Sequence, residues 1–353
     1  MNPGGVAYVR AAGAHAEIGR QHGSVRAAAL REFVADGLCR LHRVMPEPVS
    51  LDALRPTIDA YRSAVGTYLP GLAEEVGGLA DGAGISLDEA WLLQLRREIM
   101  GYHKVRAVAE CTTYARLAGE PVLAQTIDLN GNLDDQLCIL DVAPTGARGR
   151  ALVLSFAGLA GYLGLNGDGL AVGLNLVLGG EWGPGVPPYL AIRHLLDTAS
   201  TVDEAIAVLR ALPLASSRSF TLCDPEKAAW VEVLDGRLYV VEGEQTVHTN
   251  HFLHPEFAPH DEINVFARNS SVRRLDACRE RLALLPEAAG PEEHFALLSA
   301  EPIRVPDEGD IRRERTVAAV VMLLRRGELH LRPGDPALHA TELFTLSPVG
   351  ASW

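Results

Sequence analysis

From Cys111 onward the sequence is divided into short apolar segments that Gly, Pro, Asn and Asp separate. Such segments are typical of β-strands. The expected strands lie in 111–118, 121–129, 135–144, 150–158, 169–179, 219–224, 227–236 and 236–243, with helices in 187–200, 201–212, 270–285 and 291–300 and a final hairpin in 316–336. Runs of strands interleaved with pairs of helices indicate an α+β fold with layers in one compact body.

The residues before this point have a different pattern, which predicts helices from about Ala14 to Tyr102. One helix begins after an N-cap at Ser50, although Pro56 is a candidate break in it. Another begins at Ser86, with Glu89 three residues later as in a capping box, and the basic residues near its end suit the helix dipole. We therefore expect a helix-rich part, 1–110, followed by a β-rich part, 111–353.

Composition narrows the class of protein. The 353 residues are 48% hydrophobic and 22% charged, which is ordinary for a globular protein, and the net charge of −13 includes no basic stripe that would suit nucleic acid. No apolar run approaches the about 20 residues of a membrane span, and the first residues lack the pattern of a signal peptide. The five cysteines are scattered and form no C-x-x-C pair, so we expect a reducing, cytoplasmic location.

Cys111 stands apart from the other cysteines because it opens a predicted strand and is followed by two threonines. Its thiol could attack the carbonyl carbon of Glu110, and hydrolysis after an N→S acyl shift would leave Cys111 as a new N-terminus. Its α-amine, with a reference pKa of roughly 8, could then act as the base for the thiol. The alternative is an ordinary strand in which Cys111 is a small buried apolar residue.

Several motifs, taken in their order along the chain, resemble those of the acyl-coenzyme A:isopenicillin N acyltransferase-like family, the peptidase C45-type N-terminal nucleophile (Ntn) hydrolases. The chain is more distantly similar to bile salt hydrolases and penicillin V acylases. The matching stretches are EIGRQHG, ECTTYA, LAQTID, LGLNGDGLAVGLNLV, VPPYLAIRHLLDTASTVDEAIAVL, HTNHF, NSSVRRL and TVAAVVM. The resemblance implies an α+β fold of the Ntn-hydrolase type, a four-layer αββα sandwich, with self-cleavage between Glu110 and Cys111.

The resemblance also implies roles for individual residues. Cys111 would be the nucleophile, and Asp128 would orient its α-amine, since a strand, a turn and a returning strand can bring Asp128 back to Cys111. The rival interpretation of Asp128 is an ordinary cap at a strand end. Asn175 and Asn250 would form the oxyanion hole. A polar amide in the apolar strand around Asn175 favours function, whereas Asn250 could equally belong to a turn.

Arg274 would be the active-site cation or would hold a substrate carboxylate. The neighbouring Arg273 could take that place instead, because only one of the two can point inward from a helix, and both could lie on a solvated face. The aromatic residues Tyr162, Trp182 and Tyr189 could line an apolar pocket or belong to the core.

The activity implied by the resemblance is transfer or hydrolysis of an acyl group through a Cys111 thioester, with a small-molecule amide or acyl-thioester substrate, acyl-CoA being one candidate donor. Many members act in secondary metabolism, and no cofactor or metal is required. One alternative is an uncleaved, catalytically silent binding or scaffold protein, which Glu110 and Thr126 favour because the family usually has other residues there. A second is a metal-dependent hydrolase that uses the histidines and Asp261 of the stretch His248–Asp261.

Overall fold

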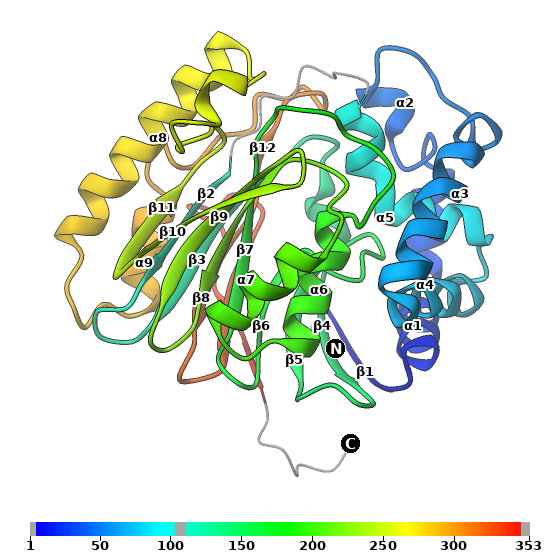
Figure 1. Cartoon of the computed structure of the whole chain (residues 1–353), viewed down its shortest axis with the longest axis horizontal. Coiled ribbons are helices and arrows are strands. Elements are labelled where there is room, and N and C mark those ends of the chain that lie inside the picture. The colour runs from blue at the N-terminus through cyan, green and yellow to red at the C-terminus, as the bar shows by residue number, and fades with distance from the viewer. Residues whose placement is uncertain (1–4, 103–110, 347–353) are drawn as a thin grey trace.

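The structure is a computed structural model that describes residues 5–102 and 111–346. Two β-sheets lie face to face in the centre, and helices cover their outer faces (Figure 1). One sheet has the order β1 (Ala7–Gly13), β4 (Leu137–Pro144), β5 (Ala151–Phe156), β6 (Leu163–Asn166), β7 (Ala171–Leu176), β8 (Arg218–Cys223), β9 (Ala228–Leu234), β10 (Arg237–Gly243). The other has the order β11 (Gln245–His248), β2 (Thr112–Arg116), β3 (Val122–Leu129), β12 (Arg315–Leu323), β13 (Glu328–Pro333), β14 (Glu342–Thr345).

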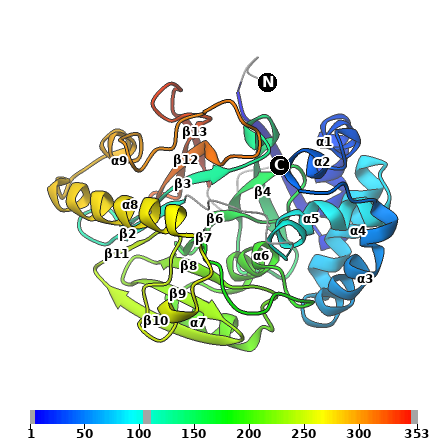
Figure 2. The same ribbon diagram turned by 90° about the horizontal axis from the view of Figure 1, so that it is seen from above.

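Helices complete the layers on both sides. The pair α6 (Pro188–Thr198) and α7 (Val202–Ala211) packs on the eight-stranded sheet, and the pair α8 (Val265–Leu284) and α9 (Pro291–Leu298) packs on the six-stranded sheet (Figure 2). Apolar side chains of both sheets fill the space between them. The predicted four-layer αββα sandwich is confirmed by this arrangement. No helix in the described ranges has the length and apolar content to cross a membrane.

A group of helices from the N-terminal part lies beside the sandwich (Figure 1). Its members are α1 (His15–Ala35), α2 (Leu41–Val44), α3 (Leu51–Tyr68), α4 (Pro70–Ala83) and α5 (Leu87–Tyr102). The capping box at the start of α5 is confirmed, since the Ser86 N–H donates to Glu89 Oε2 (2.7 Å) and the Glu89 N–H donates to Ser86 Oγ (3.2 Å). Pro56 does not end α3, whose apolar face stays buried on both sides of it.

Helices α1 and α4 approach each other unusually closely because glycines replace side chains at their contact. A Cβ atom on Gly19 would lie 1.9 Å from the carbonyl oxygen of Glu75, and one on Gly78 would lie 2.0 Å from that of Ala16. Gly23 and Gly82 show the same constraint one turn further on. The glycines of the motif EIGRQHG are therefore explained by helix packing: any side chain would push the two backbones apart.

Strand β1 is an element that the helical interpretation of the N-terminal part did not include. It pairs in parallel with β4, from Ala7 opposite Cys138 to Gly13 opposite Pro144. The N-terminal part thus contributes a strand to the central sheet as well as helices. The sequence analysis also missed β14, a short strand at the edge of the other sheet.

Candidate active site

The β2–β3 hairpin brings Asp128 to Cys111. Thr112 lies opposite Thr126 in the register, so Asp128 returns beside the residue that precedes β2. The Asp128 N–H donates to Cys111 Sγ (3.5 Å), and Sγ lies 3.9 Å from the Asp128 carbonyl oxygen. Thr126 Oγ1 accepts a hydrogen bond from the Thr112 N–H (3.1 Å), which fixes the start of β2.

Two side chains from other layers hold the carbonyl oxygen of Cys111. Asn175, on β7 of the facing sheet, donates from Nδ2 over 3.1 Å, and Arg274, on α8, donates from Nη1 over 2.7 Å. Arg274 is fully buried, whereas Arg273 is exposed, so it is Arg274 that faces the site. Asn175 is also fully buried. The site is therefore assembled between the two sheets at the end of β2.

Asn250 lies in the same cluster but is oriented differently from Asn175. Its Oδ1 accepts from Arg274 Nη2 (3.0 Å), and its Nδ2 donates to the Leu176 carbonyl oxygen (2.9 Å). Its own N–H donates to Ser271 Oγ (2.8 Å). Arg274 thus bridges Asn250 and the Cys111 main chain, and the four residues Cys111, Asn175, Asn250 and Arg274 form one connected group.

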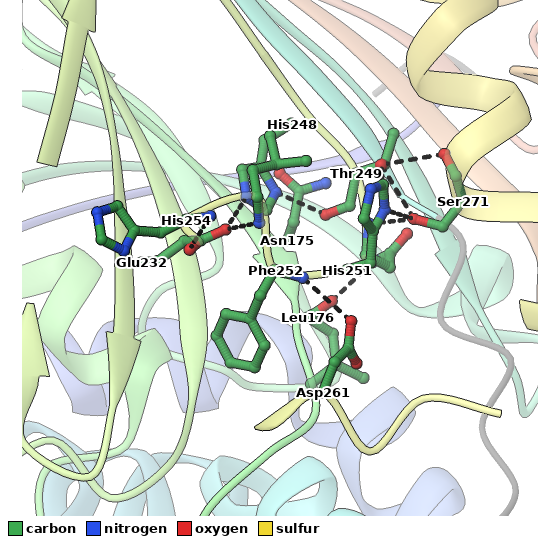
Figure 3. A network of polar contacts seen from close by, with 12 residues as sticks. Asn175, Leu176, Glu232, His248, Thr249, His251, Phe252, His254, Asp261 and Ser271 are labelled. Carbon is green, nitrogen blue, oxygen red and sulfur yellow. Dashed lines mark hydrogen bonds and ion pairs between the residues drawn. The ribbon is translucent and has the colours of Figure 1, made fainter. Parts of the chain in front are cut away.

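A buried polar network surrounds the end of β11 (Figure 3), and its member Ser271 accepts the hydrogen bond from the Asn250 N–H. His248 Nε2 pairs with Glu232 Oε1 at 2.8 Å, and His251 Nδ1 lies 2.7 Å from Ser271 Oγ. The Asp261 carboxylate accepts hydrogen bonds from the main-chain N–H groups of Phe252 and Ile263. Within residues 5–102 and 111–346, no group of three or more His, Cys, Asp or Glu side chains is arranged to hold a metal ion. The histidines of this stretch that are buried make contacts within the protein instead.

The environment of the Cys111 thiol favours its protonated form. The side chain is only 5% exposed, and burial, followed by the negative charge of Asp128, raises the pKa of the thiol to about 12. The thiolate is the reactive form of cysteine. A base in contact with Sγ is therefore needed for reactivity near neutral pH.

A small pocket opens at the thiol. Cys111 and Asp128 form part of its wall, together with Arg97, Arg218 and other residues, namely Leu129, Tyr162, Leu174, Leu176 and Tyr189. The rings of Tyr162 and Tyr189 stack with centroids 5.1 Å apart. These two tyrosines line the pocket as one interpretation of the sequence suggested, whereas Trp182 lines a separate groove.

The arginines of this pocket are functional candidates that the sequence analysis missed. Arg97 and its neighbour Arg96 were interpreted as basic residues that suit the dipole at the end of α5. That interpretation is wrong: no basic residue lies in the last turn, and Arg96 is buried. Arg218 is buried on β8, donates to Glu98 Oε1 (2.8 Å) and packs over Trp182. Nothing in the local sequence marks these side chains, because their burial depends on distant elements.

The fold and this site define a class of protein. It is a layered α+β protein in which a buried cysteine lies at the start of a strand, close to two asparagine amides and an arginine. The sequence profile of the family described as Acyl-coenzyme A:6-aminopenicillanic acid acyl-transferase matches residues 116–337. The chain belongs to this family, as the motifs predicted. It is therefore a member of a family of acyl-transferring enzymes. No curated protein sequence matches the chain significantly.

Solved structures with similar folds have low sequence identity. Penicillin V acylase from Agrobacterium tumefaciens aligns with a TM-score of 0.48 at 15% identity over 67% of this chain and 87% of its own. The Caenorhabditis elegans ortholog of N-acylethanolamine-hydrolyzing acid amidase gives 0.47 and 17% over 67% and 100%. A mutant form of conjugated bile acid hydrolase from Clostridium perfringens gives 0.47 and 11% over 67% and 97%. At such low scores these similarities carry no argument about activity.

Proposed function

We propose that this protein is a self-processing acyltransferase or amidohydrolase whose nucleophile is an N-terminal Cys111. The observation that carries the proposal is the position of Cys111. It directly precedes β2, with Sγ against Asp128 and its carbonyl oxygen held by Asn175 and Arg274. Glu110, the other side of the proposed cleavage, lies outside the described residues.

Self-processing would use only groups of the chain and water. Cys111 Sγ attacks the carbonyl carbon of Glu110, its proton passes to the Cys111 nitrogen as the C–N bond breaks, and a thioester and a free α-amine result. Water then hydrolyses the thioester, which leaves a carboxylate on Glu110 and restores the thiol of Cys111. The new α-amine supplies the base that the buried thiol otherwise lacks.

In the proposed reaction, the α-amine takes the proton of the Cys111 thiol as the sulfur attacks the carbonyl carbon of an amide or thioester. The Asn175 amide has two N–H groups, so a donor remains for the oxyanion while the other binds the main chain. Asp128 beside Cys111 would stabilise the ammonium form of the amine. That ammonium protonates the leaving group, and water or an amine then takes the acyl group from sulfur.

Asn250 is the less direct candidate for the oxyanion hole, because its Nδ2 already donates to Leu176. Its contact with Arg274 supports a role in holding that guanidinium against Cys111. A small acyl substrate, for example one of secondary metabolism or an acyl-CoA donor, would fit this chemistry.

The two alternatives differ from the proposal in simple observables. A silent scaffold with the same fold would keep an intact chain and form no acyl adduct. A metal-dependent hydrolase at His248–Asp261 would lose activity to a chelator, yet His248 in the structure is paired with Glu232.

Intact-mass spectrometry of the purified protein tests the proposal. We expect two chains that separate before Cys111, and a single full-length chain for Cys111→Ala. When a substrate is supplied without an efficient acyl acceptor, an acyl adduct should accumulate on Cys111. The added mass of this adduct identifies the acyl group. A single intact wild-type chain that forms no adduct would refute the proposed mechanism.

A further inference from the structure

A second pocket adjoins the pocket at Cys111 and is mostly apolar. Both pockets share Arg97, Leu129, Tyr162 and Tyr189 as wall residues. The remaining wall of the second pocket is apolar except at two positions, Arg96 and Asn130. Its apolar members come from α1, α5, the turn before β4 and the segments around β5, and they include Phe33, Leu93, Leu133, Phe156 and Leu159. A substrate held at the thiol could therefore extend into this second pocket.

Arg96 is a buried cation whose charge no carboxylate balances within the part of the chain that the structure describes. It is 9% exposed, its Nε donates to the Cys39 carbonyl oxygen (2.8 Å), and its Nη2 has no hydrogen-bond partner there. The other two arginines of the two pockets differ, because Arg97 faces Glu314 at 3.7 Å and Arg218 faces Glu98 at 2.8 Å.

Burial of an unbalanced charge is costly, so its retention calls for a partner. Burial lowers the pKa of Arg96 to about 10, which leaves the guanidinium charged near neutral pH. The carbonyl oxygen that accepts the hydrogen bond from Arg96 Nε belongs to Cys39. This residue lies in a run of four residues with positive φ, Gly37 to Arg40. The backbone there is thus shaped to hold Arg96 in place.

Asn130 presents a second donor in the same pocket. It is 2% exposed, and its Nδ2 likewise has no partner among the described residues. The next residue, Gly131, has a φ of +88°, and a Cβ atom there would lie 2.5 Å from Arg96 Nη2. The sequence Asn130-Gly131 therefore supplies an amide and leaves room for the guanidinium.

We propose that Arg96 and Asn130 bind a carboxylate of the substrate, so that the protein acts on acyl compounds that combine an apolar segment with a carboxylate. This inference rests on the proposed function of Cys111, which places the reacting carbonyl in the adjoining pocket. A single net cation in an apolar pocket suits a monoanion, and the planar guanidinium suits a carboxylate.

Ligand binding to the full-length Cys111→Ala variant tests the proposal without cleavage or catalysis. The probes are hexanoate and hexanamide, which match in size and differ in charge. We expect hexanoate to bind at least about tenfold more tightly in NMR titrations, since a hydrogen bond to a charged group contributes about 1.5–3 kcal/mol. Addition of Arg96→Gln should remove this preference, and Arg96→Lys should retain part of it.

Arg116→Gln is the matched control, because Arg116 is also 9% exposed and donates to a carbonyl oxygen, that of Pro286 (2.8 Å), but lines neither pocket. It should leave the preference for hexanoate within about threefold of the parent. Equal binding of the two probes to the parent, or an equal loss of the preference with Arg116→Gln and Arg96→Gln, would overturn the assignment. Should Arg96→Gln not fold, Arg96→Lys takes its place and should weaken the preference for hexanoate, whereas the control should not. Because Cys111 is absent from all these variants, a failure of self-cleavage in the wild type is a separate result.

Discussion

The Cys111 main chain and its thiol experience opposite environments. The carbonyl oxygen accepts two strong donors, one of them a guanidinium, whereas the thiol is buried and has its pKa raised to about 12. The main chain of Cys111 is thus held in position while its thiol stays protonated. In the proposed mechanism, a new α-amine on Cys111 would take the proton of the thiol, while the hydrogen bonds to the Cys111 carbonyl oxygen stay in place.

If Asn175 donates to the oxyanion as proposed, Asn175→Ala should lower kcat/KM about 10²–10³-fold, because such a donor contributes about 2.7–4 kcal/mol. The rate is measured on protein that has already been cleaved, with the same amide substrate for both proteins. Asn166→Ala is a suitable control, since Asn166 is also a buried asparagine of this sheet but binds Leu196 and Ala199. A loss of less than about threefold would mean that Asn175 only holds the Cys111 carbonyl.

The sequence allowed the proximity of Cys111 and Asp128 to be predicted because both lie in one hairpin, where register follows from local pattern. The resemblance named Arg274, but the residues alone could not decide between Arg273 and Arg274, and the burial of Arg96 was not predicted. Both depend on how a helix is rotated against distant strands, and charged residues in a helix ordinarily face solvent.

At the scale of elements, the contact of α1 with α4 is the most demanding packing in the N-terminal part. Each helix places a glycine against the backbone of the other, so the contact has no side chain that could adjust. Because α1 also packs on β1, the position of α4 determines how this helical group sits beside the sheet.

Gly78→Ala should destabilise the protein by about 1–3 kcal/mol or more, because the added methyl group overlaps the Ala16 carbonyl. Gly77→Ala is the matched control one residue away, where a Cβ meets nothing within 4 Å, and it should be neutral or stabilising by up to about 1 kcal/mol. Urea unfolding of the two variants measures the difference. Equal stabilities would show that the helices can separate at little cost.

Most helices and strands followed from apolar periodicity and turn residues, including those of the αββα layers. Strand β1 did not, since its pairing partner β4 lies more than a hundred residues away and its own pattern is only half-buried. Long-range pairing of this kind leaves a weak local signal.

At the scale of the whole molecule, the parts before and after the proposed cleavage are joined by a shared sheet and by buried ion pairs. Glu75 on α4 pairs with Arg193 at 2.7 Å, and Glu98 on α5 pairs with Arg218 at 2.8 Å. All four side chains are nearly or fully buried. Breaking such pairs leaves unbalanced buried charges, which typically costs several kcal/mol.

We therefore predict that the two chains stay associated after cleavage. They should co-elute in size-exclusion chromatography at the volume of uncut Cys111→Ala and separate only in denaturant. Separate elution in native buffer would contradict the inferred strength of this interface.

Acid should weaken the fold through buried histidines. Burial lowers the pKa of His22, His251 and His294 to about 4, against about 6.5 in the unfolded chain. Between these values the unfolded state binds protons that the folded state does not. The free energy of unfolding should thus fall as pH drops from about 6.5 to about 4, by up to about 1.4 kcal/mol per pH unit for each histidine.

His22→Gln should reduce the slope of the free energy of unfolding against pH by the equivalent of up to one bound proton. Urea unfolding at pH values from about 6.5 to about 4 measures this slope. His260→Gln is the control, because His260 is exposed. An unchanged slope for His22→Gln would show that His22 takes up its proton in the folded state.

The pairing of β1 with β4 also bears on how the protein can be produced. A gene that encodes Cys111 directly after the initiator methionine would yield the proposed nucleophile with a free α-amine once that methionine is removed. It would also leave β4 as an unpaired, largely buried edge strand. Unpaired edges of this kind recruit other chains, so such a product should precipitate unless the first segment is co-expressed. The precursor would then serve as its own folding template, and the cut would come only after assembly.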